Sequence, residues 1–262
     1  MNSEMIPVNS IQAAASGIKE IERVTGRSRY YLVDGKKLPS VTSVLSKVYP
    51  KPALYNWYAK RGREAVAEYL GDYISEPISY GLLENAVAEA KLKPTKEAQE
   101  AADLGSLAHE LISEELQGNV LPVPVVLEPV MDSFHRWEDT GQLTLVDTEV
   151  AIFVAHKIDR FSGEGYAGTI DALYTRPNGS YLLVDFKTSK AIYDDHYIQA
   201  WAYMDAIFSS TDGHINPGLI MDAQIIRLGK EVPEWEVVEV DGHREQPIWD
   251  AALAFYHALK GA

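Results

Sequence analysis

Residues 168–189 read GTIDALYTRPNGSYLLVDFKTS, with strand-forming segments on both sides of the Arg-Pro-Asn-Gly tetrapeptide at 176–179. Proline suits the second position of a type I turn, asparagine suits the third, and the glycine suits a left-handed bulge residue after it. This three-residue loop predicts a β-hairpin in which Arg176 pairs with Ser180. The hairpin therefore has a defined register, which determines the face on which each polar side chain lies.

That register brings two acids and a lysine onto one face of the sheet. Asp171 falls opposite Asp185, where the Cβ atoms of opposed residues are about 4.5–5.5 Å apart, and Lys187 follows on the same face. A two-residue loop would instead set Asp171 opposite Phe186 and put the acids on opposite faces. The apolar run at 182–184 predicts a buried strand. Buried carboxylates this close repel each other unless a cation lies between them.

These residue types suit the metal-dependent hydrolysis of a phosphodiester. Mg²⁺ prefers oxygen ligands and retains water molecules that can attack. A lysine ammonium beside such a water can orient it, stabilise the developing negative charge or act as a base. An Asp-x-Lys tripeptide alone is usually a solvated strand end. The buried strand and the opposed acid favour the functional interpretation here.

Outward from the hairpin, the hydrophobic pattern is helical in the first half of the chain and strand-like in the second. An Asp-Gly turn predicts a hairpin at 29–38, and Ser40 is expected to cap a helix. We expect helices at 40–48, 52–70, 95–118, 126–140, 193–208 and 247–259. We expect strands at 143–154, 165–175, 180–187, 219–228 and 235–240. The fold class is α/β. We expect residues 1–25 to be partly disordered, residues 26–140 to be mainly helical, and residues 141–262 to form a core sheet with flanking helices. The last two parts are expected to form one compact domain.

Composition limits the partners and the location. With 46% hydrophobic residues, a chain of 262 residues can bury a large core. Absence of cysteine excludes disulfides and thiolate metal sites. We see no secretory signal and no run near the ~18 apolar residues of a membrane span, so we expect a cytoplasmic protein without a membrane partner. The net charge of −14 disfavours tight binding to long duplex DNA unless bound metal supplies positive charge locally.

Several of these residues resemble motifs of a known nuclease superfamily. Residues 168–171 (Gly-Thr-Ile-Asp), 184–189 (Val-Asp-Phe-Lys-Thr-Ser) and 199–203 (Gln-Ala-Trp-Ala-Tyr) look like the PD-(D/E)XK superfamily, and in particular its RecB-type exonuclease branch. Ile170 replaces the proline of the superfamily name. Residues 104–109 (Leu-Gly-Ser-Leu-Ala-His) are similar to the helical histidine motif of that branch.

The resemblance implies a fold, a cofactor and a set of ligands. The implied fold is restriction-endonuclease-like, a central mixed sheet flanked by helices with a helical N-terminal part. The implied cofactor is Mg²⁺ or Mn²⁺, and an imidazole ligand favours Mn²⁺ more than an all-oxygen site would. The implied metal ligands are His109, Asp171, Asp185, the Phe186 carbonyl and, where relatives often carry another acid, Glu149. Lys187 would be catalytic together with the two aspartates.

Further side chains are candidates to contact DNA. Gln199 and Tyr203 are four residues apart and share a helix face, either toward the site or in core packing. Thr188 and Ser189 either donate hydrogen bonds to phosphate oxygens or simply end the strand. The densest basic cluster is interleaved with aromatic residues, which suits single-stranded DNA, although a solvated helix face is an equal alternative. Its members are Lys51, Trp57, Tyr58, Lys60, Arg61 and Arg63.

These residues together predict a metal-dependent DNA nuclease, an exonuclease acting on DNA ends or single strands. One alternative is a structure-specific or nicking endonuclease with the same chemistry and different substrate access. Another is a recombination or packaging factor that binds nucleic acid without cleaving it. The presence of all three catalytic residue types argues against this last interpretation. A bacteriophage origin would suit so compact a nuclease.

Overall fold

The computed structural model describes residues 2–6, 21–25, 29–75, 77–154, 165–210 and 221–261. The chain forms two compact units where one compact domain was expected. The first unit combines residues 1–49 with 108–262, and the second consists of residues 50–107. The first unit thus assembles segments that are far apart in the sequence.

Four antiparallel strands form a small sheet in the first unit. Their order is β1 (Asn2–Ile6), β2 (Ile21–Thr25), β3 (Tyr30–Val33) and β4 (Lys36–Pro39). β3 and β4 form the expected hairpin, and its turn residues Asp34 and Gly35 have φ values of 46° and 78°, as a type I′ turn requires. β1 and β2 were not expected. β1 is mostly polar, but β2 has the β-branched residues Ile21, Val24 and Thr25, a strand signal that the sequence interpretation did not use. β2 pairs with β3, and β1 pairs with β2.

A mixed five-stranded sheet forms the centre of the first unit. Its strands in order are β5 (Thr144–Val154), β6 (Tyr166–Thr175), β7 (Tyr181–Lys187), β8 (Met221–Leu228) and β9 (Trp235–Val240). β7 and β8 are parallel, and the other neighbours are antiparallel. The helix α6 (Asp194–Ser210) lies in the connection between the parallel pair. All five strands were expected from the sequence, although residues 219–220 lie outside the described part of the chain.

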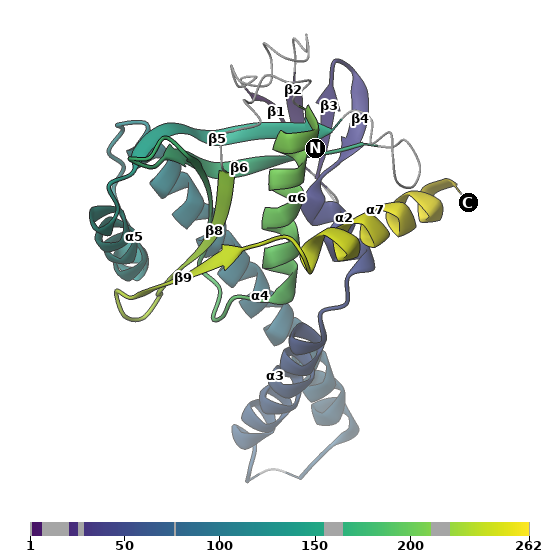
Figure 1. Ribbon diagram of the computed structural model, residues 1–262. Coiled ribbons are helices and arrows are strands. Elements are labelled where there is room, and N and C mark those ends of the chain that lie inside the picture. Colours follow the sequence, from purple (N-terminus) through teal and green to yellow (C-terminus); the bar gives the residue numbers. More distant parts are fainter. Residues whose placement is uncertain are drawn as a thin grey trace. The chain divides into compact units, whose positions relative to one another are not determined.

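Helices cover both faces of this sheet (Figure 1). On one face, α6 packs with α2 (Val41–Val48) and α7 (Glu245–Gly261) around a core that includes Leu183 of β7. On the other face, α5 (Glu128–Thr140), which follows the short 3-10 turn Val125–Leu127, places Phe134 and Trp137 edge-on to Phe186, with ring centroids 5.5 and 5.4 Å apart. Successive β7 side chains therefore alternate between two apolar layers.

Two local signals for helix ends are confirmed. The Ser40 side chain accepts a hydrogen bond from the Ser43 N–H at 3.0 Å, so it caps α2. At Gly118, just beyond α4 (Tyr80–Leu116), φ is 86°, which is the left-handed conformation that ends many helices. No helix in the described part of the chain is both long and apolar enough to cross a membrane.

The second unit contains α3 (Pro52–Gly71) and the first part of α4. The prediction that a helix begins after Pro94 is wrong, because α4 continues through this proline. Proline has no N–H for the carbonyl of Ala90, four residues earlier. That carbonyl instead faces α3, where a Cβ on Gly62 would lie only 3.0 Å from its oxygen. Glycine at position 62 thus leaves room for α3 beside the carbonyl that loses its helical donor.

Candidate functional site

The hairpin that carries the candidate site has the predicted register. The Arg176 N–H donates to the Ser180 carbonyl at 2.9 Å, and Gly179 has a φ of 82°. The regular pairing extends back to Ala172 and Val184, so the next residues along each strand are Asp171 and Asp185. Directly paired Leu173 and Leu183, two residues after Asp171 on β6 and two residues before Asp185 on β7, both lie in the core on the α6 side. Both aspartates therefore share that face of the sheet.

The two strands separate at the acids. The N–H of Phe186 donates to Asp171 Oδ2 at 2.7 Å, so a carboxylate takes the place of a backbone acceptor. Asp185 is only 1% exposed, and its Oδ2 lies 2.5 Å from Lys187 Nζ. That oxygen accepts no hydrogen bond of good geometry from the described residues. A buried carboxylate oxygen is thus held by one cation alone.

The imidazole of His109 reaches this face from α4. Its Nδ1 lies 3.2 Å from Asp171 Oδ1. Burial alone would lower the pKa of His109, but the charge of Asp171 and its hydrogen bond outweigh burial and raise that pKa above the ordinary value. The structure therefore brings together one imidazole, two carboxylates and one ammonium; the hairpin register predicted the aspartates and the lysine, and the family resemblance implied the histidine.

The pKa values of the two aspartates shift in opposite directions. Burial raises the pKa of each carboxyl group. At Asp171 the nearby charge and hydrogen bond of His109 outweigh burial, and its pKa lies below the ordinary value. At Asp185 burial and the charge of Asp171 outweigh Lys187, and its pKa lies above the ordinary value. The charge of Asp171 thus disfavours the ionised form of Asp185, as the predicted closeness of the two carboxylates implies.

Two side chains of α6 complete this face. Gln199 Nε2 donates to the Tyr203 hydroxyl at 2.8 Å and makes a longer contact of 3.4 Å with Asp185 Oδ1. Burial, together with the charge of Asp185, raises the pKa of Tyr203 well above its ordinary value, so the hydroxyl stays protonated. Gly168 allows the Tyr203 ring to approach β6, because a Cβ there would lie 2.5 Å from a ring carbon.

Glu149 of β5 lies beside these groups. Its carboxylate pairs with Arg23 at 3.1 Å. Burial and the charge of Asp171 raise its pKa. Its φ of 51° is uncommon for a residue with a side chain and costs about 1–3 kcal/mol, which the surrounding structure must offset. Glu149 thus lies near enough to Asp171 to feel its charge, but its carboxylate forms an ion pair with Arg23.

Thr148 is a residue that the sequence interpretation missed. Its hydroxyl donates to the Asp171 carbonyl at 2.8 Å and lies 3.3 Å from Ser113 Oγ. Ser113 is four residues after His109 on α4 and thus on the same helix face. That spacing is the one signal in the sequence that could have indicated a second contact between this helix and the strands.

Thr188 and Ser189, which were expected to contact DNA, lie just beyond the end of β7. Thr188 is buried directly after β7, and the Ser189 hydroxyl donates to the Ala191 carbonyl at 2.7 Å. Both therefore have the strand-ending environment that was the alternative for them. Their role toward DNA stays a prediction.

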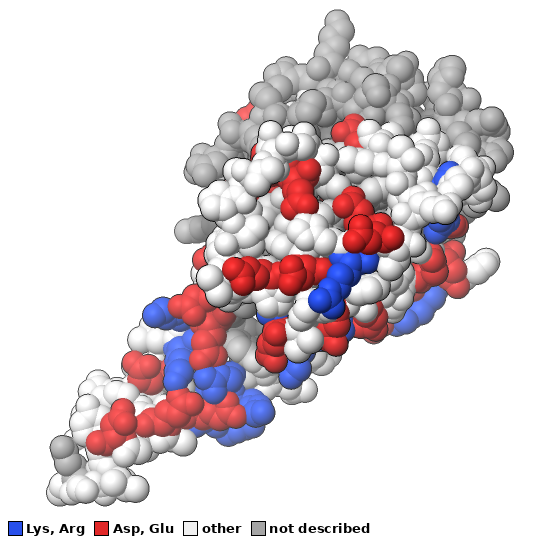
Figure 2. Space-filling model, turned by 90° about the vertical axis from the view of Figure 1, so that its left-hand side faces the viewer, with Lys and Arg blue, Asp and Glu red and all other residues white. Residues whose placement is uncertain are grey.

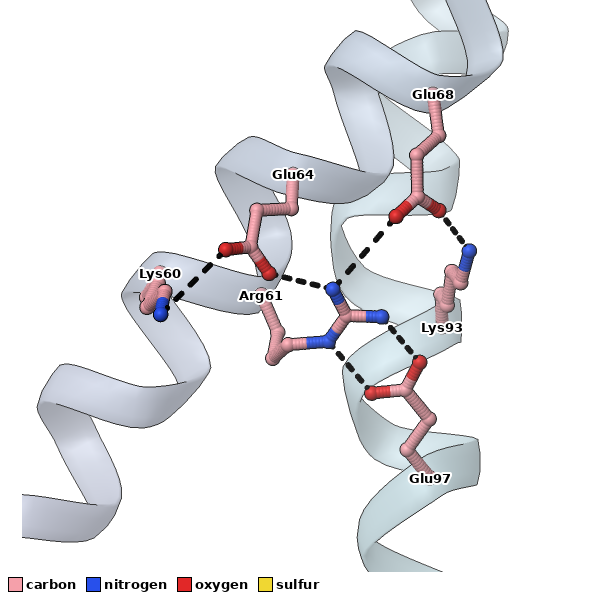
Figure 3. A network of polar contacts seen from close by, with 6 residues as sticks. All are labelled: Lys60, Arg61, Glu64, Glu68, Lys93 and Glu97. Atoms are coloured by element: carbon pink, nitrogen blue, oxygen red, sulfur yellow. Dashed lines mark hydrogen bonds and ion pairs between the residues drawn. The ribbon is translucent and has the colours of Figure 1, made fainter.

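The basic and aromatic cluster lies in the second unit. The Arg61 guanidinium binds both carboxylate oxygens of Glu97, at 2.8 and 2.5 Å, and also Glu64 at 2.5 Å (Figure 3). Lys60 lies 3.7 Å from Glu64. Trp57 packs edge-on against its neighbour Tyr58 at 5.1 Å. Acidic neighbours thus neutralise much of this cluster, which favours a structural role for Arg61 over a phosphate contact.

The donor set at the face of β6 and β7 fits a divalent metal in its chemistry. An imidazole, two carboxylates and a backbone carbonyl suit Mn²⁺ and Mg²⁺, and Asp185 Oδ2 is a buried acceptor that lacks a hydrogen bond. Within the described ranges, however, no group of three or more His, Asp and Glu side chains is arranged to hold a metal ion. His109 and Lys187 each face one aspartate instead.

Comparison with known proteins yields little. No family model matches the chain, and no curated protein matches it. Among solved structures, one titled "Crystal structure of SSO0001" is 13% identical to this chain, covering 76% of this chain and 86% of that one with a TM-score of 0.39. A likeness this low carries no argument about family or activity.

Proposed function

We propose that the chain is a metal-dependent nuclease of the RecB-type PD-(D/E)XK kind that hydrolyses phosphodiester bonds in DNA, as an exonuclease acting on ends or single strands. One observation carries the proposal. Side chains from α4, β6 and β7 converge on one face of a buried hairpin, where His109, Asp171, Asp185 and Lys187 meet. A purely structural role would not need two opposed acids in an apolar sheet.

His109, Asp171, Asp185 and the Phe186 carbonyl would hold Mg²⁺ or Mn²⁺, which when bound lowers the pKa of a coordinated water and polarises a phosphate oxygen. Side chains of this face would contribute the rest of the chemistry. Lys187 holds an ammonium beside Asp185, so it offers a fixed positive charge to the phosphate or to the attacking water.

The α6 side chains would orient the site. The Gln199 amide contacts Asp185 and donates to Tyr203. The Tyr203 hydroxyl is an acceptor in that bond and keeps its proton at neutral pH, so the proton is available for a phosphate oxygen. These two residues are therefore proposed to position the acid and the substrate rather than to react.

The test is cleavage of end-labelled single-stranded DNA, end-labelled duplex DNA and covalently closed circles, each with Mg²⁺, Mn²⁺ or EDTA. We expect the linear substrates to be degraded with either metal, and circles and EDTA samples to stay intact. Asp185→Asn and Lys187→Ala should each abolish cleavage, while Lys190→Ala, an exposed lysine three residues on, should retain it.

Near-UV circular dichroism of each variant checks that the fold is intact. Cleavage of closed circles would replace the exonuclease by an endonuclease with the same centre. Full activity in both the Asp185→Asn and Lys187→Ala proteins would refute the assignment of the site. Binding of Mn²⁺ and DNA without any cleavage would favour a non-catalytic nucleic-acid-binding factor.

A further inference from the structure

An apolar surface runs along α4 in the second unit. The face of α4 that packs on α3 is lined by small residues such as Ala86, which is 1% exposed. Away from it lie large side chains that remain largely exposed: Tyr80 at 77%, Leu83 at 44%, Val87 at 57% and Leu92 at 62%. Large exposed apolar side chains that follow one another along a helix mark a contact with a partner.

Two opposite charges lie within this surface. Glu84 and Lys91 line the same hollow of α4 as these apolar side chains and Ala88. They are seven residues apart, about 10 Å along the helix, which is too far for an ion pair within it. Neither has an oppositely charged residue three or four positions away, and neither forms an ion pair with another described residue. Both charges therefore lie in an apolar surface that does not neutralise them.

The positions of the two charges are symmetric. Glu84 and Lys91 lie three and a half residues on either side of the midpoint between Val87 and Ala88. A two-fold axis at this midpoint that relates two antiparallel copies of α4 places Glu84 of each copy opposite Lys91 of the other. It also places Val87 of each copy level with Ala88 of the other and only one residue along the helix from its own counterpart, and alanine permits close approach of the helices. A parallel pair would instead oppose like charges.

We propose that this surface of α4 is a homodimer interface in which two copies of the chain pack α4 antiparallel about the Val87–Ala88 midpoint. Two Glu84–Lys91 ion pairs form across the axis, and Leu83 and Leu92 shield them from solvent. The contact is isologous, so each residue in it is used twice. The inference does not depend on the proposed nuclease function.

The first test is the oligomeric state of the full chain by sedimentation velocity, from about 1 µM to about 1 mM, the range in which small interfaces dissociate. We expect reversible dimerisation. Glu84→Lys and Lys91→Glu should each weaken it at least tenfold, because the two-fold axis turns two attractive contacts into two repulsive ones. The double variant E84K/K91E should restore it. The control Lys96→Glu, an exposed lysine of the same helix that does not line the hollow, should leave it unchanged.

The second test uses the absence of cysteine from the chain. Val87→Cys should form an intermolecular disulfide on mild oxidation, because its counterpart lies across the axis within the ~7 Å between Cα atoms that a disulfide spans. Lys96→Cys should not. A monomer at every concentration, failure of the double variant to restore association, or equal cross-linking at both positions would overturn the proposal.

Discussion

At the scale of single residues, the Thr148 hydroxyl joins the parts of the candidate site that come from different elements. It contacts the Asp171 carbonyl on β6 and Ser113 on α4, one turn after His109. The helix that carries the imidazole is therefore tied to the strand that carries the acid. A polar contact that fixes the distance between two reacting groups affects the reaction rate by more than its contribution to stability would suggest.

Thr148→Val keeps the shape of the side chain and removes the hydroxyl. We expect it to lower the free energy of unfolding by about 1–2 kcal/mol, because the buried acceptors lose their donor. The proposed cleavage should fall further than this loss of stability explains. Urea unfolding and initial cleavage rates measure the two effects, and Thr148→Ser should behave nearly as the wild type. Equal stability and activity in the valine and serine variants would contradict a linking role.

Glu138 on α5 predicts a pH dependence outside the candidate site. Burial, followed by the charge of Glu115, raises its pKa, against smaller opposing effects of His135 and Tyr174. An acid with a raised folded-state pKa contributes stability below its ordinary pKa of about 4.3 and loses it as the pH rises through the folded value.

Glu138→Gln should therefore be more stable than the wild type at pH 7, and the difference should disappear below about pH 4, where the ordinary carboxyl is protonated. Thermal unfolding across this range measures it. Asp132→Asn, an exposed acid on the same helix, is the matched control and should show no comparable change. A destabilised Glu138→Gln protein at neutral pH would mean that the charged form is favoured in the fold.

At the scale of elements, the second unit depends on how α3 and α4 hold together. Small residues pack at Gly62, and a network of polar contacts also joins the two helices (Figure 3). Arg61 of α3 donates two hydrogen bonds to the carboxylate of Glu97 on α4, and these hydrogen bonds lower the pKa of Glu97. Lys93 of α4 pairs with Glu68 of α3 in the same network. Bidentate arginine pairs of this kind are more specific than single surface ion pairs.

We expect Arg61→Met to loosen the α3–α4 pair and Lys60→Met to leave it nearly unchanged. Arg61 bridges the two helices, whereas Lys60 pairs with Glu64 on its own helix at 3.7 Å. Hydrogen exchange of the amides in 52–71 and 80–107 should be several-fold faster in Arg61→Met alone. The same exchange rates in both variants would show that apolar packing, and not the network, holds the pair.

At the scale of the whole molecule, the charge is strongly negative. The chain carries 24 basic and 38 acidic side chains, a net charge of −14. On the face shown in Figure 2, acidic side chains extend across much of the described surface, with basic side chains interspersed among them. Affinity for a polyanion cannot come from bulk attraction in such a protein.

DNA binding should therefore depend on the divalent metal. Lys187→Ala, which is expected not to cleave, allows binding to be measured by fluorescence anisotropy with labelled single-stranded DNA. We expect at least tenfold tighter binding with Mn²⁺ than with EDTA, a difference of about 1.4 kcal/mol or more. Adding either Asp171→Asn or Asp185→Asn to Lys187→Ala should abolish the difference in affinity between Mn²⁺ and EDTA. Equal affinity with Mn²⁺ and EDTA would place the binding surface elsewhere.

The sequence alone determined most of the first unit, for a local reason. Turn chemistry at 176–179 sets a register within a few residues, and that register predicted the opposition of Asp171 and Asp185 before any contact was known. Segments rich in β-branched and aromatic residues likewise predicted strands of the central sheet. Interactions this short in sequence are encoded in propensities that do not require the rest of the chain.

Only the tertiary structure decided the rest. The strand at 21–25 pairs with β3 and the strand at 2–6 pairs with β2, while α4 continues through Pro94 beside a close approach to Gly62 on another helix. The ion pair of Arg23 with Glu149 and the contacts of the Thr148 hydroxyl with Ser113 and Asp171 likewise join segments far apart in the chain. Free energy gained from distant partners outweighs local propensity at these positions, and no window of sequence contains both partners.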